Sequence, residues 1–234
     1  MNVRVIAPDV FGAASLAAFQ ELADGFASPV VGLATGNSPV PLYEALRSAV
    51  LAATATVEGI RPFAIDEYGG ARQHHCSNRA FFADYWDSIP GARPVQQFDP
   101  EAADRDVEAA RFAALLAGAG GLDVAILGIG MNGHLAFNEP GSPRDSPTRG
   151  TALTAATIES SRPCWADAAP NWGLTLGLRE LLGARAVLLL ANGAHKANIV
   201  RQALEGPIGS ECPASYLQLH RRTIVVLDAA SADA

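Results

Sequence analysis

One glycine-rich loop, residues 128–140, carries the side chains best suited to acid–base chemistry. His134 and Glu139 both lie in it, so the Glu139 carboxylate can fix the tautomer of the His134 imidazole and raise its basicity. A histidine alone is more often structural, and it is this neighbouring carboxylate that favours catalysis. The pair could carry protons to and from a bound substrate. The glycines of the loop lack the spacing of a dinucleotide-binding fingerprint, which disfavours NAD.

Two further acids, Asp66 and Glu67, follow the apolar segment Phe63-Ala64-Ile65. Neighbouring side chains on a strand point to opposite faces, so only one of the two acids should face a cleft. A partly desolvated carboxylate there would suit the removal of a proton from carbon. The alternative is a helix cap or a solvated turn, and the sequence leaves both open.

Two segments could hold an anion. Thr35-Gly36-Asn37-Ser38 combines two hydroxyls, a flexible glycine and backbone N–H groups ahead of Pro39, although an ordinary capped turn has the same composition. Lys196 is the only lysine among 17 basic residues. It lies near the start of a predicted helix, where its charge opposes the helix dipole. A bound anion would offset that cost, whereas a surface lysine would need none.

Short apolar runs that alternate with longer segments of helical composition must position these residues. The predicted strands are Val3–Ile6, Val30–Ala34, Phe63–Asp66, Val124–Leu127, Ala186–Ala191 and Thr223–Leu227. The predicted helices are Ser15–Phe26, Pro41–Ala53, Asn78–Trp86, Glu101–Ala117, Leu174–Leu182 and Ala194–Glu205. This alternation predicts the α/β fold class, with a single doubly wound, mostly parallel, Rossmann-like sheet and helices on both faces.

The predicted topology brings the candidate residues together. No internal repeat and no long linker divides the sequence, so residues 1–234 are expected to form one domain. In a doubly wound sheet, ligands bind beyond the carboxyl ends of the strands. The segments at 35–38, 66–68, 128–140 and 192–196 each follow a predicted strand, and we expect them to converge on one edge of the sheet.

The composition excludes several classes of partner. A net charge of −7 with no basic run disfavours nucleic acid and anionic membrane surfaces. The most apolar later segment, residues 113–130, is broken by glycines and by Asp123, which does not suit a membrane span. The first residues resemble an opening strand and not a signal peptide. We therefore expect a protein of the cytoplasm.

The spacing of cysteines and histidines predicts neither a disulfide nor a metal site. The three cysteines are an odd number without short paired spacing, which fits a reducing compartment; they are Cys76, Cys164 and Cys212. The histidines outside the glycine-rich loop show no spacing typical of metal ligands; they are His74, His75, His195 and His220. No metal is assigned.

Several motifs occur in a characteristic order along the chain. They are Gly32 to Pro39, Asp66-Glu67-Tyr68, Gly128-Ile129-Gly130, Gly133 to Gly141, Thr154 to Arg162, Gly193 to Lys196 and Leu217 to His220. Each is weak alone, but the ordered set covers nearly the whole sequence and resembles the glucosamine-6-phosphate deaminase family.

The resemblance implies an aldose–ketose isomerisation with deamination in amino-sugar catabolism. Glucosamine 6-phosphate and water would give fructose 6-phosphate and ammonia, without a cofactor. By the same resemblance, His134 opens the pyranose ring with the support of Asn132 and Glu139. Asp66 would move a proton from C2 to C1 through an enolamine. The phosphate of this small-molecule partner would bind Thr35, Gly36, Asn37, Ser38, Arg162 and Lys196.

The chain departs from the family pattern in three places. Asn132 stands where some members carry Asp, which removes negative charge near the imidazole and should make His134 less basic. Asn37 replaces a commoner Gly, Ser or Thr, which a site built on backbone donors tolerates. Residues 145–150 lack the fuller basic pattern of allosterically activated hexamers, and the chain stops soon after Asp228. We therefore expect an unregulated monomer or low-order homo-oligomer.

Two alternative functions stay open. Galactosamine 6-phosphate differs from the glucosamine epimer by one hydroxyl, and a single hydrogen bond could decide between them. The hydrolase 6-phosphogluconolactonase is similar in fold, but its strand-end carboxylate is typically followed by an Arg-containing motif where this chain has Glu67-Tyr68. The loop containing Glu139 also favours the deaminase. A non-catalytic sugar-phosphate sensor is disfavoured because no residues remain for a DNA-binding module.

Overall fold

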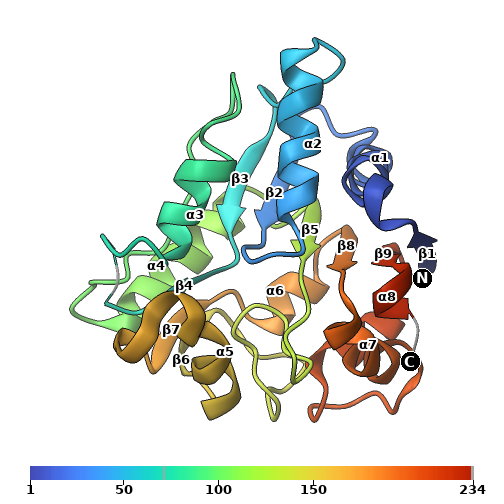
Figure 1. The fold of residues 1–234 in the computed structure, drawn as a ribbon. Coiled ribbons are helices and arrows are strands. Elements are labelled where there is room, and N and C mark those ends of the chain that lie inside the picture. Colours follow the sequence, from blue (N-terminus) through green and yellow to red (C-terminus); the bar gives the residue numbers. More distant parts are fainter. Residues whose placement is uncertain (71, 233–234) are drawn as a thin grey trace.

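A six-stranded parallel sheet forms the centre of the protein, as a computed structural model that describes residues 1–70 and 72–232 shows (Figure 1). In sheet order the strands are β1 (Asn2–Ile6), β9 (Thr223–Asp228), β8 (Ala186–Ala191), β5 (Val124–Leu127), β2 (Val30–Leu33) and β3 (Arg61–Ala64). Every residue of β2, β5, β8 and β9 is buried. Burial on both faces explains why these strands are continuous apolar runs without polar alternation.

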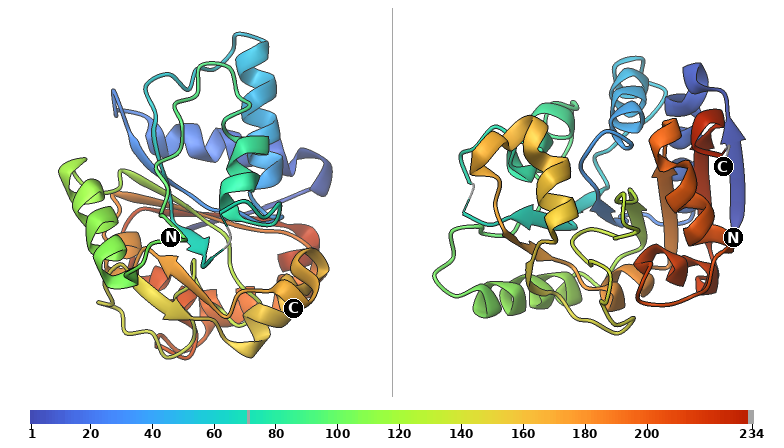
Figure 2. Two further views of the ribbon diagram at one scale, coloured as in Figure 1. Left: turned by 90° about the vertical axis from the view of Figure 1, so that its left-hand side faces the viewer. Right: turned by 60° about the horizontal axis from the view of Figure 1, so that its bottom comes forward.

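Helices cover both faces of this sheet, which confirms the predicted doubly wound class (Figure 2). One face packs against α1 (Phe11–Ala23), α2 (Val40–Leu51) and α3 (Asn78–Tyr85), and the other against α4 (Arg105–Gly118), α6 (Leu178–Leu182) and α7 (Ala197–Glu205). Along β8, Leu188 packs on the face covered by α1, α2 and α3, and Leu189 packs on the face covered by α4, α6 and α7, because side chains alternate across a strand. The shorter helical segments are η1 (Pro8–Val10), η2 (Ala166–Ala168), η3 (Ala194–Lys196), η4 (Pro213–Leu219) and α8 (Ala229–Ala232). Over residues 1–70 and 72–232, no helix has the length and apolarity that a bilayer crossing requires.

A second sheet, which the sequence patterns did not predict, lies beside the first. Its three antiparallel strands are β4 (Asp66–Tyr68), β7 (Trp172–Thr175) and β6 (Arg149–Ala152), in that order. The predicted helix Leu174–Leu182 is therefore wrong in its first part, because only Leu178–Leu182 is helical. Pairing with β4 and β6 on either side makes this segment a strand, and its close approach to the glycine-rich loop requires Gly173, since a Cβ there would lie 2.6 Å from the Phe137 ring.

The predicted strand Phe63–Asp66 divides between the two sheets. β3 ends at Ala64 and β4 begins at Asp66. Between them, the N–H of Ile65 donates to the carbonyl of Leu33, and the carbonyl of Ile65 accepts from the N–H of Leu176. Asp66 is thereby held at the junction of the two sheets, where the chain leaves one hydrogen-bonding pattern for the other.

These two bonds at Ile65 join the sheets into a continuous hydrogen-bonded frame. We propose on this basis that residues 1–234 fold as one domain. Urea unfolding followed by tryptophan fluorescence and by far-ultraviolet circular dichroism should then give superimposable transitions. Two separated transitions would divide the chain into two units.

The structure corrects the expectation that the cysteines are unpaired. Cys76, in the segment before α3, forms a disulfide with Cys164 in the last turn of α5 (Ala155–Trp165), and their Cα atoms are 5.9 Å apart. The two residues are 88 positions apart in the sequence, so only the tertiary fold brings them together. Cys212 is free and buried.

Cys164→Ser should lower the free energy of unfolding by about 2–4 kcal/mol, because the disulfide restricts a long loop in the unfolded chain. Urea unfolding without reductant measures the difference, and added reductant should bring the wild-type protein to the midpoint of the variant. Cys212→Ser is the control that should not respond to reductant. Equal midpoints for wild type and Cys164→Ser would mean that the two sulfurs are not bonded in solution.

Candidate active site

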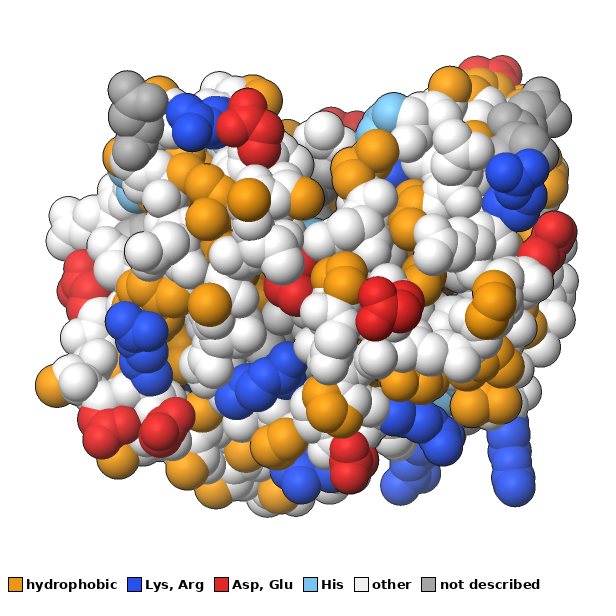
Figure 3. Space-filling view, turned by 90° about the horizontal axis from the view of Figure 1, so that it is seen from below, with side chains coloured by type: hydrophobic (Ala, Val, Ile, Leu, Met, Phe, Trp, Pro, Cys, Tyr) orange, Lys and Arg blue, Asp and Glu red, His pale blue; other side chains and the backbone are white. Residues whose placement is uncertain are grey.

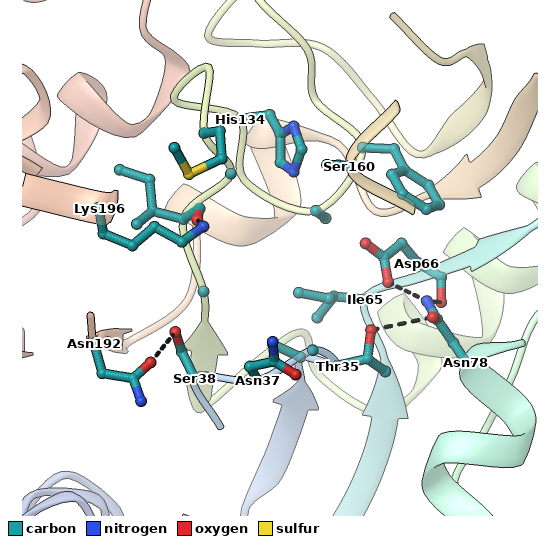
Figure 4. Close-up of a pocket in the computed structure, with 18 of the residues that line it drawn as sticks. Thr35, Asn37, Ser38, Ile65, Asp66, Asn78, His134, Ser160, Asn192 and Lys196 are labelled. Atoms are coloured by element: carbon teal, nitrogen blue, oxygen red, sulfur yellow. Dashed lines mark hydrogen bonds between the residues drawn. The ribbon is translucent and has the colours of Figure 1, made fainter. Parts of the chain in front are cut away.

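A pocket of about 400 Å³ opens at the carboxyl ends of the central strands (Figure 4). It lies where β2, β3, β5 and β8 end, which confirms the predicted convergence on one edge of the sheet. The predicted residues that line it are Thr35, Gly36, Asn37, Ser38, Asp66, His134 and Lys196. Three predicted residues lie outside this lining. Asn132 and Glu139 contact His134 from behind, and Arg162 is on α5, within 2.5 Å of Glu159.

The loop between β2 and α2 lines the pocket with residues 35–38. Gly36 has a φ of +93°, a left-handed conformation that glycine adopts without strain. The Ser38 hydroxyl donates to the side-chain carbonyl of Asn192 at 2.8 Å, which ties the loop to the end of β8. Residues 36–38 line the pocket at this point, and the backbone N–H groups of such a loop can bind an anion.

Lys196 extends across the same end of the pocket. It is the last residue of η3 and directly precedes α7, so it lies near the start of a helix as predicted, although the α-helix begins at Ala197 and not at Ala194. Its ammonium donates to the carbonyl of Ile129 at 2.5 Å and lies across from Ser38 in Figure 4. Burial lowers the pKa of Lys196, because a charged ammonium loses hydration there. An anion in the pocket would compensate for that loss.

The structure decides between the two acids that follow β3. Asp66 faces the pocket, whereas Glu67 turns toward α3 and accepts the backbone N–H groups of Tyr68, Asn78 and Arg79, each at 2.9 Å. Glu67 therefore contributes to the capping of α3, and Asp66 is the cleft carboxylate. Burial, followed by the charge of Glu67, raises the pKa of Asp66 to about 8. Such a group can exchange protons near neutral pH.

Asn78, the first residue of α3, is a pocket residue that sequence reasoning missed. Its side-chain amide donates to the Asp66 carboxylate at 2.6 Å and to the Asp66 carbonyl at 3.0 Å. Asn is common at the start of a helix for purely structural reasons, so the residue type carried no functional signal. Tyr68 and His195 also line the pocket, and His74 and His75 do not.

His134 forms a compact network with the groups behind it. Its Nδ1 atom lies 3.3 Å from a Glu139 carboxylate oxygen and 3.3 Å from the Thr157 hydroxyl. The Asn132 amide donates to the same Glu139 oxygen at 2.7 Å. Burial alone would raise the pKa of Glu139, but hydrogen bonding and charge from His134, with bonds from Thr157 and Asn132, hold it at about 2. Glu139 is thus a permanent anion beside the imidazole. Asn132 is hydrogen-bonded to that anion, a contact through which it could give His134 the support that the resemblance implies.

Gly130 makes room for the imidazole. A Cβ at this position would lie 2.3 Å from the His134 ring, so any side chain must displace the histidine. Gly130→Ala should therefore lower kcat by about tenfold to a hundredfold, because small displacements of a reacting group are costly. The measurement is steady-state turnover. Gly118→Ala is the matched control, since a Cβ there meets nothing within 4 Å. Full turnover of Gly130→Ala would remove His134 from the reaction.

One histidine and cysteine group lies outside the pocket. The side-chain atoms of His74, His75 and Cys76 that could bind a metal lie within 4.8 Å of one another, although the spacing of these residues in the sequence did not predict a metal site. The sulfur of Cys76 belongs to the disulfide. The His74 ring stacks on the Trp165 ring, with the two ring centroids 4.1 Å apart. This cluster therefore joins the segment before α3 to α5.

An open parallel sheet with polar groups and a perturbed carboxylate at its carboxyl edge is the architecture of an enzyme that acts on a small ligand. Residues 12–226 match the family model described as glucosamine-6-phosphate isomerases/6-phosphogluconolactonase, and the chain belongs to that family.

Relatives with curated names give the same placement. The chain is 41% identical over 208 residues to the glucosamine-6-phosphate deaminase of Shewanella loihica, covering 87% of this chain and 78% of that protein. It is 38% identical over 223 residues to the deaminase of Pseudarthrobacter chlorophenolicus, covering 93% and 85%.

Two solved structures are similar to this protein over nearly the whole chain. A monomeric glucosamine-6-phosphate deaminase superposes with a TM-score of 0.92 at 30% identity, over 99% of both chains. The 6-phosphogluconolactonase of Trypanosoma brucei has a TM-score of 0.75 at 24% identity, over 99% of this chain and 97% of that one, a likeness of fold alone.

Proposed function

We propose that the protein is a glucosamine-6-phosphate deaminase, which converts glucosamine 6-phosphate and water to fructose 6-phosphate and ammonia. One observation carries the proposal: Asp66 and His134 face a single pocket whose other end holds Lys196 and Ser38 (Figure 4). A phosphorylated sugar needs this combination, with donors for the phosphate at one end and proton carriers for carbon and oxygen at the other.

His134 opens the sugar ring in this mechanism. The imidazole takes the proton of the anomeric hydroxyl and returns a proton to the ring oxygen, so that the pyranose becomes an open-chain aldehyde. The anionic Glu139, 3.3 Å away, stabilises the imidazolium that forms between the two transfers. Asn132 holds the Glu139 carboxylate in place for this task.

Asp66 performs the isomerisation. In its ionised form it removes the C2 proton of the open-chain sugar, and protonation of the C1 carbonyl oxygen then gives an enolamine, whose double bond between C1 and C2 carries the hydroxyl on C1 and the amino group on C2. Return of the proton to C1 leaves an imine at C2. Water adds to this imine, the C2–N bond breaks, ammonia leaves, and the ketone of fructose 6-phosphate remains. The pKa of about 8 suits a carboxyl that both takes and returns a proton.

In this proposal the phosphate binds Gly36, Asn37 and Ser38, whose backbone N–H groups would be its donors, and the ammonium of Lys196, all of which line the pocket. Arg162 is kept as a further cationic partner, and it lies on α5, the helix that also contributes Ser160 to the pocket. On the face drawn in Figure 3, basic and acidic side chains both stand at several separate places. With a net charge of −7 for the whole sequence, an anion is attracted by the local groups of the pocket and not by an overall positive charge.

Ammonia release from the purified protein tests the proposal. Glucosamine 6-phosphate, galactosamine 6-phosphate and unphosphorylated glucosamine are compared, with fructose 6-phosphate measured as the second product. Release from glucosamine 6-phosphate with little from the other two is the expected result. Preference for galactosamine 6-phosphate would change the epimer and keep the chemistry. No release, together with hydrolysis of 6-phosphogluconolactone, would establish the lactonase function instead.

We also propose that the protein is a monomer, since the structural relative with a TM-score of 0.92 is described as monomeric. Light scattering coupled to size-exclusion chromatography should give the 24.3 kDa of one chain. A separate proposal concerns the compartment, which we expect to be the cytoplasm. A charged sugar phosphate does not cross a bilayer unaided and must be used where it forms. There the Cys76–Cys164 disulfide would face thiol reductants.

A further inference from the structure

The side chain of Asn78 connects the loop at 35–38 with Asp66 (Figure 4). Only 4% of Asn78 is exposed. Its Nδ2 group donates to the Asp66 carboxylate at 2.6 Å and to the Asp66 carbonyl at 3.0 Å. Its Oδ1 atom accepts from the Thr35 hydroxyl at 3.1 Å. All the polar groups of this side chain are therefore paired with parts of the site.

The orientation of the Asn78 amide follows from its neighbours. Both groups near Nδ2 are acceptors, a carboxylate oxygen and a backbone carbonyl, so Nδ2 must be the donor and Oδ1 must face Thr35. Thr35 must then donate its hydroxyl proton to Asn78. A hydroxyl has one proton, so Thr35 has none left to give to a phosphate. Its contribution to the site is to fix Asn78.

The backbone of Asn78 is held as firmly as its side chain. Its N–H donates to the buried Glu67 carboxylate at 2.9 Å, and Ser77 caps the same helix by accepting from the N–H of Ala80. The start of α3 is thus anchored next to β4. The side-chain amide of Asn78 is therefore fixed, and it cannot follow the Asp66 carboxylate if that group moves. The Asp66 carboxylate is held instead by the amide.

We propose that Asn78 is a positioning residue for Asp66: its amide holds the carboxylate at a fixed angle to the pocket and favours the ionised, proton-accepting form. Thr35 locks the amide, which couples the position of the loop at 35–38 to the state of Asp66. The effect on turnover rests on the proposed function, whereas the effect on the ionisation of Asp66 does not. An N–H donor favours the charged carboxylate, opposing the effects of burial and of the Glu67 charge.

Asn78→Ala tests the proposal through pH dependence. Loss of a hydrogen bond to a charged group should raise the pKa of Asp66 by about one to two units. The acidic limb of kcat/KM should move to higher pH by that amount. At pH 7, kcat should fall by about tenfold to a hundredfold with KM nearly unchanged. Asn78→Asp should move the limb further, because a second carboxylate then stands beside the first.

A structural role would give a different result. Ser77→Ala is the matched control, because it removes one capping hydrogen bond of α3, to the N–H of Ala80, without touching Asp66. It should lower the melting temperature and leave the acidic limb where it is. If Asn78→Ala lowers activity evenly at all pH values, as a weakened helix would, the proposal is wrong. Should that variant not fold, Thr35→Val must shift the limb upward and Thr35→Ser must restore it.

The ionisation of Asp66 can also be read without turnover. Carbon-13 NMR of aspartate carboxyls gives its pKa directly, and Asp66→Asn identifies the resonance. A higher pKa in Asn78→Ala supports the positioning role even if wild-type protein releases no ammonia, in which case the proposed function alone fails. An unchanged pKa in an active enzyme overturns the positioning role alone.

Discussion

Asp66→Asn should lower kcat for ammonia release by about a hundredfold or more while leaving KM nearly unchanged, as expected when a general base is lost and substrate binding is retained. The amide has the shape of the carboxyl and cannot accept a proton from carbon. Steady-state kinetics at pH 7 and pH 8 are the measurement. Loss of C2 proton exchange with solvent should accompany the loss of turnover. Wild-type turnover in the variant would show that another group is the base.

The same substitution should stabilise the protein at neutral and higher pH. The carboxyl of Asp66 has a pKa of 3.8 in an unfolded chain and of about 8 when folded. The folded state therefore binds the proton more tightly, and this contribution to stability is fully present below the unfolded pKa and is lost as the pH rises to about 8. At pH 8 the buried carboxyl is a cost that an amide avoids. Melting temperatures should agree near pH 4 and favour Asp66→Asn by several degrees at pH 8. Equal values at both pH values would mean that Asp66 is hydrated in the free enzyme.

Lys196→Ala should lower kcat/KM by about tenfold to a hundredfold, chiefly by raising KM, because it removes a contact to a phosphate that does not react. Its ammonium lies at the same end of the pocket as Ser38, far from the carboxylate of Asp66 in the view of Figure 4. Inhibition by inorganic phosphate should weaken in parallel. The measurement is the substrate dependence of ammonia release, with phosphate as the competing ligand.

Lys196→Arg is the matched variant. It keeps the positive charge but replaces a compact ammonium with a planar guanidinium. We therefore expect it to recover part of the affinity for the phosphate, but not the hydrogen bond to the Ile129 carbonyl in its original geometry. Unchanged KM and unchanged phosphate inhibition in Lys196→Ala would place the phosphate elsewhere in the pocket. A fall in kcat alone would instead give Lys196 a part in the chemical steps.

Much of the central sheet could be predicted from local sequence. Runs such as Val124–Leu127 and Ala186–Ala191 are apolar throughout because helices bury both faces of the strands, and this leaves a signal that needs no knowledge of the partners. The position of the pocket followed from the same signal, because the carboxyl ends of parallel strands meet at one edge. The His134 and Glu139 pair was visible because its members share one loop.

The second sheet and the assignments that depend on side-chain direction were decided by tertiary structure. β7 owes its conformation to β4 and β6, which are distant in sequence, so a local reading assigned its residues to a helix. Asp66 and Glu67 are adjacent and chemically alike, and only the position of α3 shows that Glu67 caps the helix.

The distance in sequence between interacting residues separates what the sequence by itself determined from what only the tertiary structure decided. The sequence determined the fold class, the family motifs and the location of the pocket, all of which depend on residues close together in the chain. The Cys76–Cys164 disulfide and the bonds that Asn78 makes to Thr35 and Asp66 join residues from different elements. Such contacts depend on how the elements pack, and spacing along the chain carries no record of them.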